Sequence, residues 1–378
     1  MNTRPSEDQQ AIKDMAERFT AEEITPHASR WDTENFCPRD TLRQAGALGF
    51  GAIYLPEAVG GIGLTRVEAA LIMEAMAYGC PSTSAYVSIH NMATWMIAEY
   101  GDTPVRASYL PRLIGMEQLA SYCLTEPGSG SDAASLKTRA VRDGDHYVVN
   151  GSKAFISGGG ENEVYVCMVR TSDDGHRGIT CLVVDKDTPG VSFGAQERKL
   201  GWHSQPTAMV NFADARVPVA NRVGDEGDGF RIAMAGLDGG RLNIGACSLG
   251  GAQRCLDEAV AYVKERHQFG RAIAEFQNTQ FMLAEMKTEL EAARALLYVA
   301  AQKVSENAHD KTEYAAMAKL KATETGSRIA NDALQLHGGY GYLMDYPIER
   351  FVRDLRVHEI LEGTNQIMRM VVGRKLVS

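Results

Sequence analysis

The sequence predicts a mainly α-helical protein with a β domain in its middle. Apolar residues recur at helical spacing over roughly the first 120 of the 378 residues, and this spacing returns after Gly224. Between these parts, short β-branched runs alternate with Gly-containing turns, as in a small sheet. We therefore predict three domains: an N-terminal helical domain at 1–120, an antiparallel β domain at 121–224 and a C-terminal helical bundle at 225–378.

The overall composition argues against several classes of partner. The formal net charge of -9 disfavours nucleic acid and anionic membranes, because both repel an acidic surface. No window approaches the roughly 18 consecutive apolar residues of a membrane span, and the first ten residues lack the pattern of a signal or transit peptide. The seven cysteines are dispersed without a C-x-x-C pair, which indicates reduced thiols. We expect a cytoplasmic protein, and we assign no residue to a metal.

Local signals define the helices of the N-terminal part. Residues 12–19 place apolar side chains at positions i, i+3, i+4 and i+7, which is one face of a helix. Asp40 is in position to cap the next helix. Thr65 and Glu68 match a capping box that opens a helix through residue 78. His90 interrupts an apolar segment, and we expect a hydrogen-bonded histidine of the core or of a pocket wall.

The middle part consists of predicted strands and turns. Asp143-Gly144 and Asn150-Gly151 bracket residues 146–149, which predicts a short strand between two hairpin turns. Residues 164–169 and 179–184 are apolar, β-branched runs, typical of buried strands. Two shorter runs continue the pattern, at 191–193 and 209–212.

Three helices are expected in the C-terminal part. Leu249, Leu256 and Val263 recur every seven residues along the first. Apolar residues at 283–300 alternate in steps of three and four, which suits a helix in a near-antiparallel bundle. A third helix over about 314–336 should end at 337–339, His-Gly-Gly, because glycine stops helices.

The turn around Glu362 is the main candidate for chemistry. Leu361 before it offers a low-dielectric wall, which raises the pKa of a carboxylate and strengthens it as a base. Gly363 after it allows a ligand to approach the backbone closely. The same residues also predict a plain turn between two helices, with Thr364 as the cap of the second. The two interpretations are compatible, since a base needs a rigid turn.

Residues 122–132, YCLTEPGSGSD, form the densest cluster of polar loop residues. A strand that runs into such a loop presents backbone N–H and hydroxyl groups to a flat, hydrogen-bonding cofactor edge or to an anion. The loop lacks both the P-loop and the GxGxxG patterns. Its composition alone predicts a surface turn equally well.

Three separated stretches together resemble the acyl-CoA dehydrogenase family: residues 122–132, residues 266–277, which begin RHQFG, and the Glu362-Gly363-Thr364 turn. The resemblance covers nearly the whole chain and its helix–sheet–helix order. It implies an N-terminal α domain, a middle antiparallel β domain and a C-terminal four-helix bundle. It also implies an FAD enzyme that oxidises an acyl thioester to its α,β-enoyl form.

The resemblance assigns the proton transfer to Glu362. In the family, this carboxylate takes the α-proton while flavin N5 takes the β-hydride. The backbone N–H of the base and a flavin hydroxyl bind the thioester carbonyl, so the Gly363 turn must be rigid. Some members carry the base directly before the position that matches Arg241, where this chain has Gly240. The resemblance therefore leaves Glu362 as the base.

The resemblance also implies two groups of flavin contacts. The first follows the ring, where Phe155 offers stacking area and Ser157 a hydrogen bond; it consists of Tyr122, Cys123, Leu124, Thr125, Gly130, Ser131, Phe155, Ile156, Ser157, Thr364 and Gln366. The second serves the pyrophosphate and adenine, partly from a neighbouring subunit; it consists of Arg266, Gln268, Phe276, Gln277, Gln335, Leu336, His337, Gly338 and Gly339. Such sharing implies a homotetramer built as a dimer of dimers. Apart from the resemblance, Arg266 reads as an exposed cation at a helix end.

For the acyl-CoA substrate, the resemblance implies contacts from Ser131, Asp238, Arg241, Gly363 and Arg374. Arg374 fits a helix C-terminal cation equally well. Within the family, the chain looks most like members that oxidise isobutyryl-CoA to methacrylyl-CoA in valine catabolism. The stretches that carry this likeness are 88–92, 121–136, 150–158, 201–207 and 356–363, with a small departure at His203. Activity on 2-methylbutyryl or short straight chains stays open, since one methylene is worth only about 1–3 kcal/mol.

Electrons would pass to an electron-transfer flavoprotein, as in the family. The alternatives are another enzyme, an acyl-CoA oxidase; a non-catalytic flavoprotein or assembly factor on the same fold; and a DNA-associated flavoprotein. The presence of Glu362 and of all the flavin segments argues against the second. The net charge of -9 argues against the third.

Overall fold

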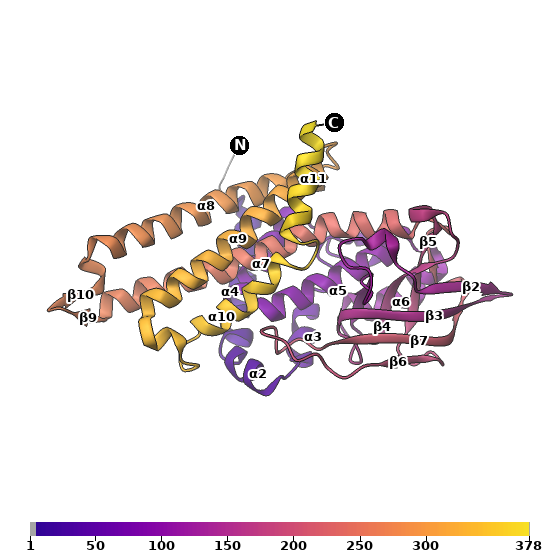
Figure 1. The fold of residues 1–378 in the computed structure, drawn as a ribbon, viewed down its shortest axis with the longest axis horizontal. Coiled ribbons are helices and arrows are strands. Elements are labelled where there is room, and N and C mark those ends of the chain that lie inside the picture. Colours follow the sequence, from indigo (N-terminus) through magenta and orange to yellow (C-terminus); the bar gives the residue numbers. More distant parts are fainter. Residues whose placement is uncertain (1–4, 378) are drawn as a thin grey trace.

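A computed structural model describes residues 5–377 and has the predicted order of helices, sheet and helices (Figure 1). The first helical part contains α1 Glu7–Phe19, η1 Thr20–Ile24, α2 Ala28–Glu34, α3 Arg39–Ala47, η2 Glu57–Val59, α4 Arg66–Gly79, α5 Pro81–Tyr100 and α6 Thr103–Ile114. The capping box at the start of α4 is confirmed. The Thr65 side chain accepts a hydrogen bond from the backbone N–H of Glu68, and the Glu68 side chain accepts one from the backbone N–H of Thr65. None of the described helices is long and apolar enough to cross a membrane.

The predicted cap at Asp40 is wrong. Helix α3 begins one residue earlier, at Arg39, and Pro38 takes the capping position without a side-chain hydrogen bond. Proline needs no N–H partner at a helix start, so it can begin the helix there. Asp40 lies instead in the first turn, where its carboxylate pairs with Arg43 at 3.1 Å.

His90 of α5 is a satisfied core histidine, as expected. Its Nε2 lies 2.8 Å from the carbonyl of Leu113, and its Nδ1 accepts from the backbone N–H of Ala120 at 3.0 Å. Burial lowers the pKa of His90 to about 4, which keeps the ring neutral. The residue thereby ties α5 to the first strand of the sheet.

The middle part forms an eight-stranded sheet in the order β6-β7-β3-β2-β4-β5-β8, with β1 added beside β4. Its elements are β1 Ala120–Cys123, η3 Ala133–Ser135, β2 Arg139–Asp143, β3 His146–Ser157, β4 Val164–Arg170, η4 Gly175–Gly178, β5 Ile179–Asp185, β6 Val191–Phe193, β7 Thr207–Pro218, η5 Val219–Asn221 and β8 Arg222–Val223. Most pairings are antiparallel, as predicted. The pairings of β1 with β4 and of β2 with β4 are parallel, so the sheet is mixed.

The predicted second hairpin turn at Asn150-Gly151 is also wrong. Strand β3 runs through this dipeptide, and its register with β7 shifts between Val149 and Gly151 as in a β-bulge. Gly151 has a φ of 140°, and a Cβ there would approach the Thr138 Oγ1 to 2.6 Å. The Asn-Gly pair therefore extends the strand toward Ser157 instead of reversing the chain.

Strands β4 and β5 are buried on both faces, which explains their unbroken apolar sequences. Val164, Val166 and Met168 pack into the large core shared with the helices, while Tyr165 and Cys167 pack into a second core on the other face. The sheet is thereby held firmly against the helical part on one side.

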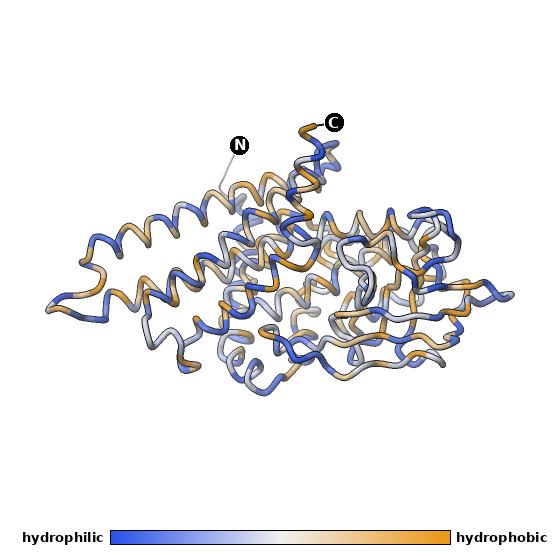
Figure 2. Tube along the Cα trace, in the orientation of Figure 1, coloured by the Kyte–Doolittle hydropathy of each residue, from blue (hydrophilic) through white to orange (hydrophobic). Residues whose placement is uncertain are grey.

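The C-terminal part is built on one very long helix. Its elements are α7 Gly229–Glu265, β9 His267–Gln268, β10 Arg271–Ala272, η6 Ile273–Glu275, α8 Gln277–Ser305, α9 Lys311–His337, η7 Gly338–Tyr342, α10 Ile348–Arg356, η8 Val357–Glu359 and α11 Asn365–Val377. Helices α7, α8 and α9 lie side by side, and hydrophilic and hydrophobic turns alternate along α8 (Figures 1 and 2). One end of α7 packs on the sheet and the other carries β9 and β10.

Candidate active site

Glu362 lies in the turn between η8 and α11, against the middle of α7. Its backbone has a φ of 56° and that of Gly363 a φ of 88°, so two successive residues adopt the left-handed conformation. The turn aims the carboxylate at Gly240 of α7, where a Cβ would lie only 2.4 Å from Oε2. The residue is half-buried, but Oε2 itself is out of solvent and has no hydrogen-bond partner among the described residues. A strained, unpartnered carboxylate of this kind is typical of a functional site.

Burial raises the pKa of Glu362 from 4.5 to about 7, against the opposing charges of Arg241 and Lys319. A carboxylate with such a pKa is ionised in part at neutral pH and binds a proton well, as a general base requires. Helix α11 begins directly after the turn, and Thr364 accepts from the backbone N–H of Ile367 at 3.3 Å. The predicted cap and the predicted high pKa are thus both present.

Two buried cations hold this turn. The Arg241 Nε donates to the carbonyl of Glu362 at 3.3 Å, and its Nη1 donates to Asp238 at 3.0 Å. The Lys319 ammonium donates to the carbonyl of Gly363 and to the Asn365 side chain, both at 2.8 Å. Burial lowers the pKa of Lys319 to about 8. Arg241 and Asp238, predicted to contact the substrate, are buried and are bonded within the protein.

Sequence reasoning missed Lys319. Its position carried a signal, because residues 315, 319, 322 and 326 fall on one helical face of α9 and all are buried. A lysine on an otherwise Ala/Gly face must find a partner inside the protein. Here that partner is the base-bearing turn.

Sequence reasoning also missed Tyr54, Asn243 and Arg66 as residues of this region. The Tyr54 hydroxyl and the Asn243 Nδ2 are buried without hydrogen-bond partners among the described residues, as is the hydroxyl of the predicted residue Tyr122. Burial raises the pKa of Tyr122, and the Glu362 charge raises it further, which places the two groups close together. The Arg66 guanidinium stacks 3.5 Å from the Tyr54 ring and against Gly239. The one available signal was the spacing of Gly236, Gly239 and Gly240 on α7, since glycines leave room for large side chains to pack against a helix.

A buried ion pair with Lys153 of β3 holds the 122–132 loop in place. The Lys153 ammonium contacts Glu126 at 2.7 Å and the carbonyl of Leu124 at 3.1 Å, and both charged side chains are buried. Burial works to raise the pKa of Glu126, but Lys153 and the neighbouring N–H groups hold this pKa below its ordinary value. Removing one member of such a pair is costly, so the loop is rigid.

The residues predicted to contact the flavin ring differ in their solvent exposure. Phe155 has a φ of 59° and a ring that is 69% exposed, while Ser157 is half-buried at the end of β3. The side chains of Cys123 and Ile156 point into the second core, and Leu124 is buried in the first, so these three offer only backbone atoms. Thr125 is half-buried, and Gly130, Ser131 and Gln366 are exposed. The exposed Phe155 ring and the unpartnered Tyr122 hydroxyl fit a flat, partly polar ring such as a flavin.

The residues predicted to bind the pyrophosphate and adenine lie at the far end of the molecule. Arg266, Gln268 and residues 335–339 line one hollow of about 420 Å³, while Phe276 and Gln277 lie beside it at the start of α8. This hollow is at the β9–β10 end of α7, and the sheet is at the other end (Figure 1). A helix of 37 residues spans about 55 Å, so one chain does not bring the two flavin groups together.

Arg374 does not lie beside the Glu362 turn. It is exposed near the end of α11, which projects away from the bundle (Figure 1). Arg374 is the tenth residue of α11, roughly 15 Å along the helix from its start after the turn. Only a ligand that reaches well beyond the turn would contact both.

Comparison with known proteins identifies the fold as that of flavin-dependent acyl-thioester oxidoreductases. Residues 6–117, 121–215 and 227–377 match the models of the N-terminal, middle and C-terminal domains of acyl-CoA dehydrogenases. The chain belongs to the acyl-CoA dehydrogenase family, whose members use FAD.

Individual relatives are similar over nearly their whole length. Proteins called isobutyryl-CoA dehydrogenase, mitochondrial, from Dictyostelium discoideum and Bos taurus are each 54% identical over 98% of this chain and 89% of their own. An acryloyl-CoA reductase (NADH) from Anaerotignum propionicum is 40% identical over 98% of this chain and 94% of its own. The solved structure of butyryl-CoA dehydrogenase from Megasphaera elsdenii is 35% identical, covers 100% of both chains and superposes with a TM-score of 0.97.

Proposed function

We propose that this acyl-CoA dehydrogenase oxidises isobutyryl-CoA to methacrylyl-CoA and that Glu362 removes the α-proton. The observation that carries the proposal is the unpartnered Glu362 Oε2, held against Gly240 with a pKa of about 7. The 54% identity to two isobutyryl-CoA dehydrogenases supports the choice of acyl group.

The protein's own residues perform the acid–base part of the reaction. Glu362 takes the α-proton on its free oxygen, and the backbone N–H of the same residue stabilises the negative charge that develops on the thioester oxygen. FAD, when bound, accepts the β-hydrogen as a hydride. Arg241 and Lys319 bind the carbonyls of Glu362 and Gly363, two successive residues, so they fix base and N–H together. Tyr122, Phe155, Ser157 and the 122–132 loop would hold the flavin ring.

The test is Glu362→Gln, which keeps the volume of the side chain and removes its basicity. The purified variant should retain FAD, and isobutyryl-CoA should no longer bleach the flavin absorption. Glu359→Gln is the matched control, since this nearby carboxylate pairs with Arg356 at 3.7 Å and forms no hydrogen bond with the turn among the described residues. Near-normal bleaching by Glu362→Gln would mean that another group is the base. Wild-type rates with isobutyryl-, 2-methylbutyryl- and butyryl-CoA distinguish the acyl preferences.

We further propose a homotetramer in which the hollow of Arg266, Gln268 and residues 335–339 serves the FAD of a neighbouring subunit. The separation of this hollow from the Phe155 side of the same chain supports sharing. Arg266→Ala should then lower the flavin content and the molecular mass in solution together. Full flavin content after gel filtration would contradict this contact.

Electron-transfer flavoprotein is the proposed electron acceptor. Rapid turnover with that acceptor and little oxygen consumption without it is the expected result, while fast oxygen consumption would identify an oxidase. The seven unpaired cysteines fit a reducing compartment. We keep the cytoplasm as the proposed location, although two relatives carry the word mitochondrial in their names.

A further inference from the structure

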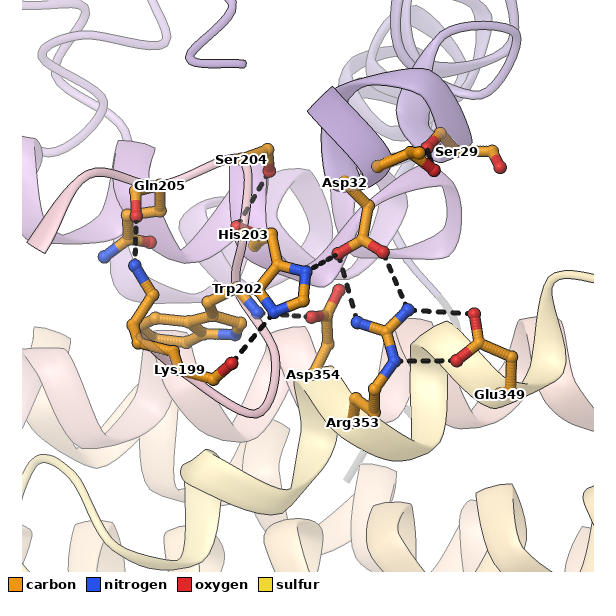
Figure 3. Close-up of polar contacts among 12 residues, drawn as sticks. Ser29, Asp32, Lys199, Trp202, His203, Ser204, Gln205, Glu349, Arg353 and Asp354 are labelled. Atoms are coloured by element: carbon orange, nitrogen blue, oxygen red, sulfur yellow. Dashed lines mark hydrogen bonds and ion pairs between the residues drawn. The ribbon is translucent and has the colours of Figure 1, made fainter. Parts of the chain in front are cut away.

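The segment 199–205 between β6 and β7 makes polar contacts with helices from both helical parts of the chain (Figure 3). Trp202 and Ser204 anchor it to two helices. The Trp202 backbone N–H donates to Asp354 of α10 at 2.6 Å, and the Ser204 hydroxyl donates to Ser82 of α5 at 2.9 Å. These bonds join residues that are more than a hundred positions apart in the sequence, so only the folded protein holds the segment in place.

His203 provides a third anchor. Its Nδ1 lies 3.2 Å from Asp32, and its Nε2 lies 2.9 Å from the carbonyl of Lys199. The Asp32 carboxylate also accepts from Arg353 at 2.7 Å, and Arg353 is held on its other side by Glu349 at 2.6 Å (Figure 3). Both ring nitrogens of His203 therefore face acceptors, which fixes the orientation of the ring.

These anchors place Gln205, which is fully buried. Its backbone N–H donates to the carbonyl of Trp202 at 3.1 Å, and its carbonyl accepts from the Lys199 ammonium at 2.6 Å. Its side-chain Nε2 donates to the Ser157 hydroxyl oxygen at 2.6 Å. The backbone of Gln205 is thus fixed at both polar atoms before the amide reaches Ser157.

The bond from Gln205 decides which way the Ser157 hydroxyl can donate. An N–H donor occupies one side of the oxygen, so the hydroxyl proton must point elsewhere. The Ser157 hydroxyl donates no hydrogen bond to any described residue, and the Gln205 amide oxygen, which is turned away from it, is itself without a partner there. Ser157 is half-buried at the end of β3, two residues from the exposed Phe155 ring.

We infer that Gln205 is a positioning residue that directs the Ser157 hydroxyl proton toward the flavin. The inference rests on the proposed placement of the flavin beside Phe155 and Ser157. Gln205 does not touch the flavin in this scheme and acts only through Ser157. Without it, the hydroxyl rotates freely and donates to the ring for only part of the time.

The experiment combines Gln205→Met, Gln205→Glu, Ser157→Ala and the double variant Ser157→Ala/Gln205→Met, each as the full-length FAD-loaded protein. The methionine keeps the side-chain volume and removes the donor, while the glutamate replaces the donor by an acceptor. The visible absorption spectrum and the reduction potential of the bound flavin are measured without substrate, so they report on Gln205 even if the proposed substrate is wrong. Flavin reduction by isobutyryl-CoA is measured separately.

All three single variants should shift the flavin spectrum in the same direction and slow flavin reduction roughly tenfold, as expected for one lost oriented hydrogen bond. Gln205→Met should add nothing when Ser157 is already alanine. Gln196→Met is the control, because Gln196 lies on the same connection but binds the carbonyl of Gly159 and the N–H of Thr207. Independent, multiplicative effects of the two substitutions would overturn the inference. So would an unchanged spectrum and potential in both Gln205 variants, or an equal shift from Gln196→Met.

Discussion

Lys319→Met tests how the base acquires its pKa. Lys319 is buried and makes two bonds of 2.8 Å to the turn, and its charge is one of the two that lower the pKa of Glu362. Methionine matches the length of the side chain but has no charge. The pKa of Glu362 should therefore rise above its present value of about 7.

The magnitude follows from the ionised fraction of Glu362. At pH 7 a carboxylate with a pKa of about 7 is half ionised. A rise of about one unit, equivalent to about 1.4 kcal/mol, leaves about one tenth ionised and slows proton removal about fivefold. The loss should disappear near pH 9, where the base is ionised in both proteins. For stability, two charge-assisted bonds of about 1.5–3 kcal/mol each are offset by the removed desolvation of the ammonium, so we expect a net loss of about 1–3 kcal/mol.

The assay is the rate of flavin reduction by isobutyryl-CoA between pH 6 and pH 9.5, with the apparent pKa of the acidic limb as the result. Lys321→Met is the matched control, because Lys321 lies two residues further along α9 and pairs with Glu289 away from the turn. An acidic limb that stays in place or moves to lower pH would refute the reasoning. A rate loss that is the same at every pH would show that Lys319 only shapes the turn.

Three further predictions concern the same framework. Gly240→Ala should displace the Glu362 carboxylate, because its Cβ would lie 2.4 Å from Oε2; we expect a rate loss of more than about tenfold with unchanged FAD content, whereas near-normal turnover would contradict this packing. Because the folded pKa of Glu362 is raised from 4.5 to about 7, the stability it contributes is complete below pH 4.5 and is lost as pH rises through 7. Glu362→Gln should thus have a higher free energy of unfolding than the wild type at pH 8.5, by up to about 3 kcal/mol, and this difference should disappear near pH 4.5. A stability difference that does not change with pH would exclude this carboxylate as its cause. Lys153→Met should leave the buried Glu126 without its charged partner and lower the free energy of unfolding by about 3–5 kcal/mol. Lys137→Met changes an exposed neighbour and should have little effect. Equal melting temperatures for Lys153→Met and the wild type would argue against the buried pair.

The order of elements was predictable because it depends on neighbours in the sequence. Helical spacing located α7, α8 and α9, and the capping box at Thr65 opened α4 as expected. Errors arose where a distant contact overrode a local signal. The Asn150-Gly151 pair favours a hairpin turn by itself, yet pairing with β7 and the contact with Thr138 make it a bulge. The parallel partner of β1 likewise lies more than forty residues away.

The sequence by itself determined the helix–sheet–helix order, the lone carboxylate at Glu362 and the glycine after it, since spacing and turn chemistry act over a few residues. Only the tertiary structure decided what that carboxylate can do. Gly240 and Lys319 are 122 and 43 residues away from Glu362 in the sequence, but they supply the dry surface and the charge that set its pKa. Desolvation and Coulomb interaction depend on distance in space, and folding alone brings these groups within a few ångströms of one another.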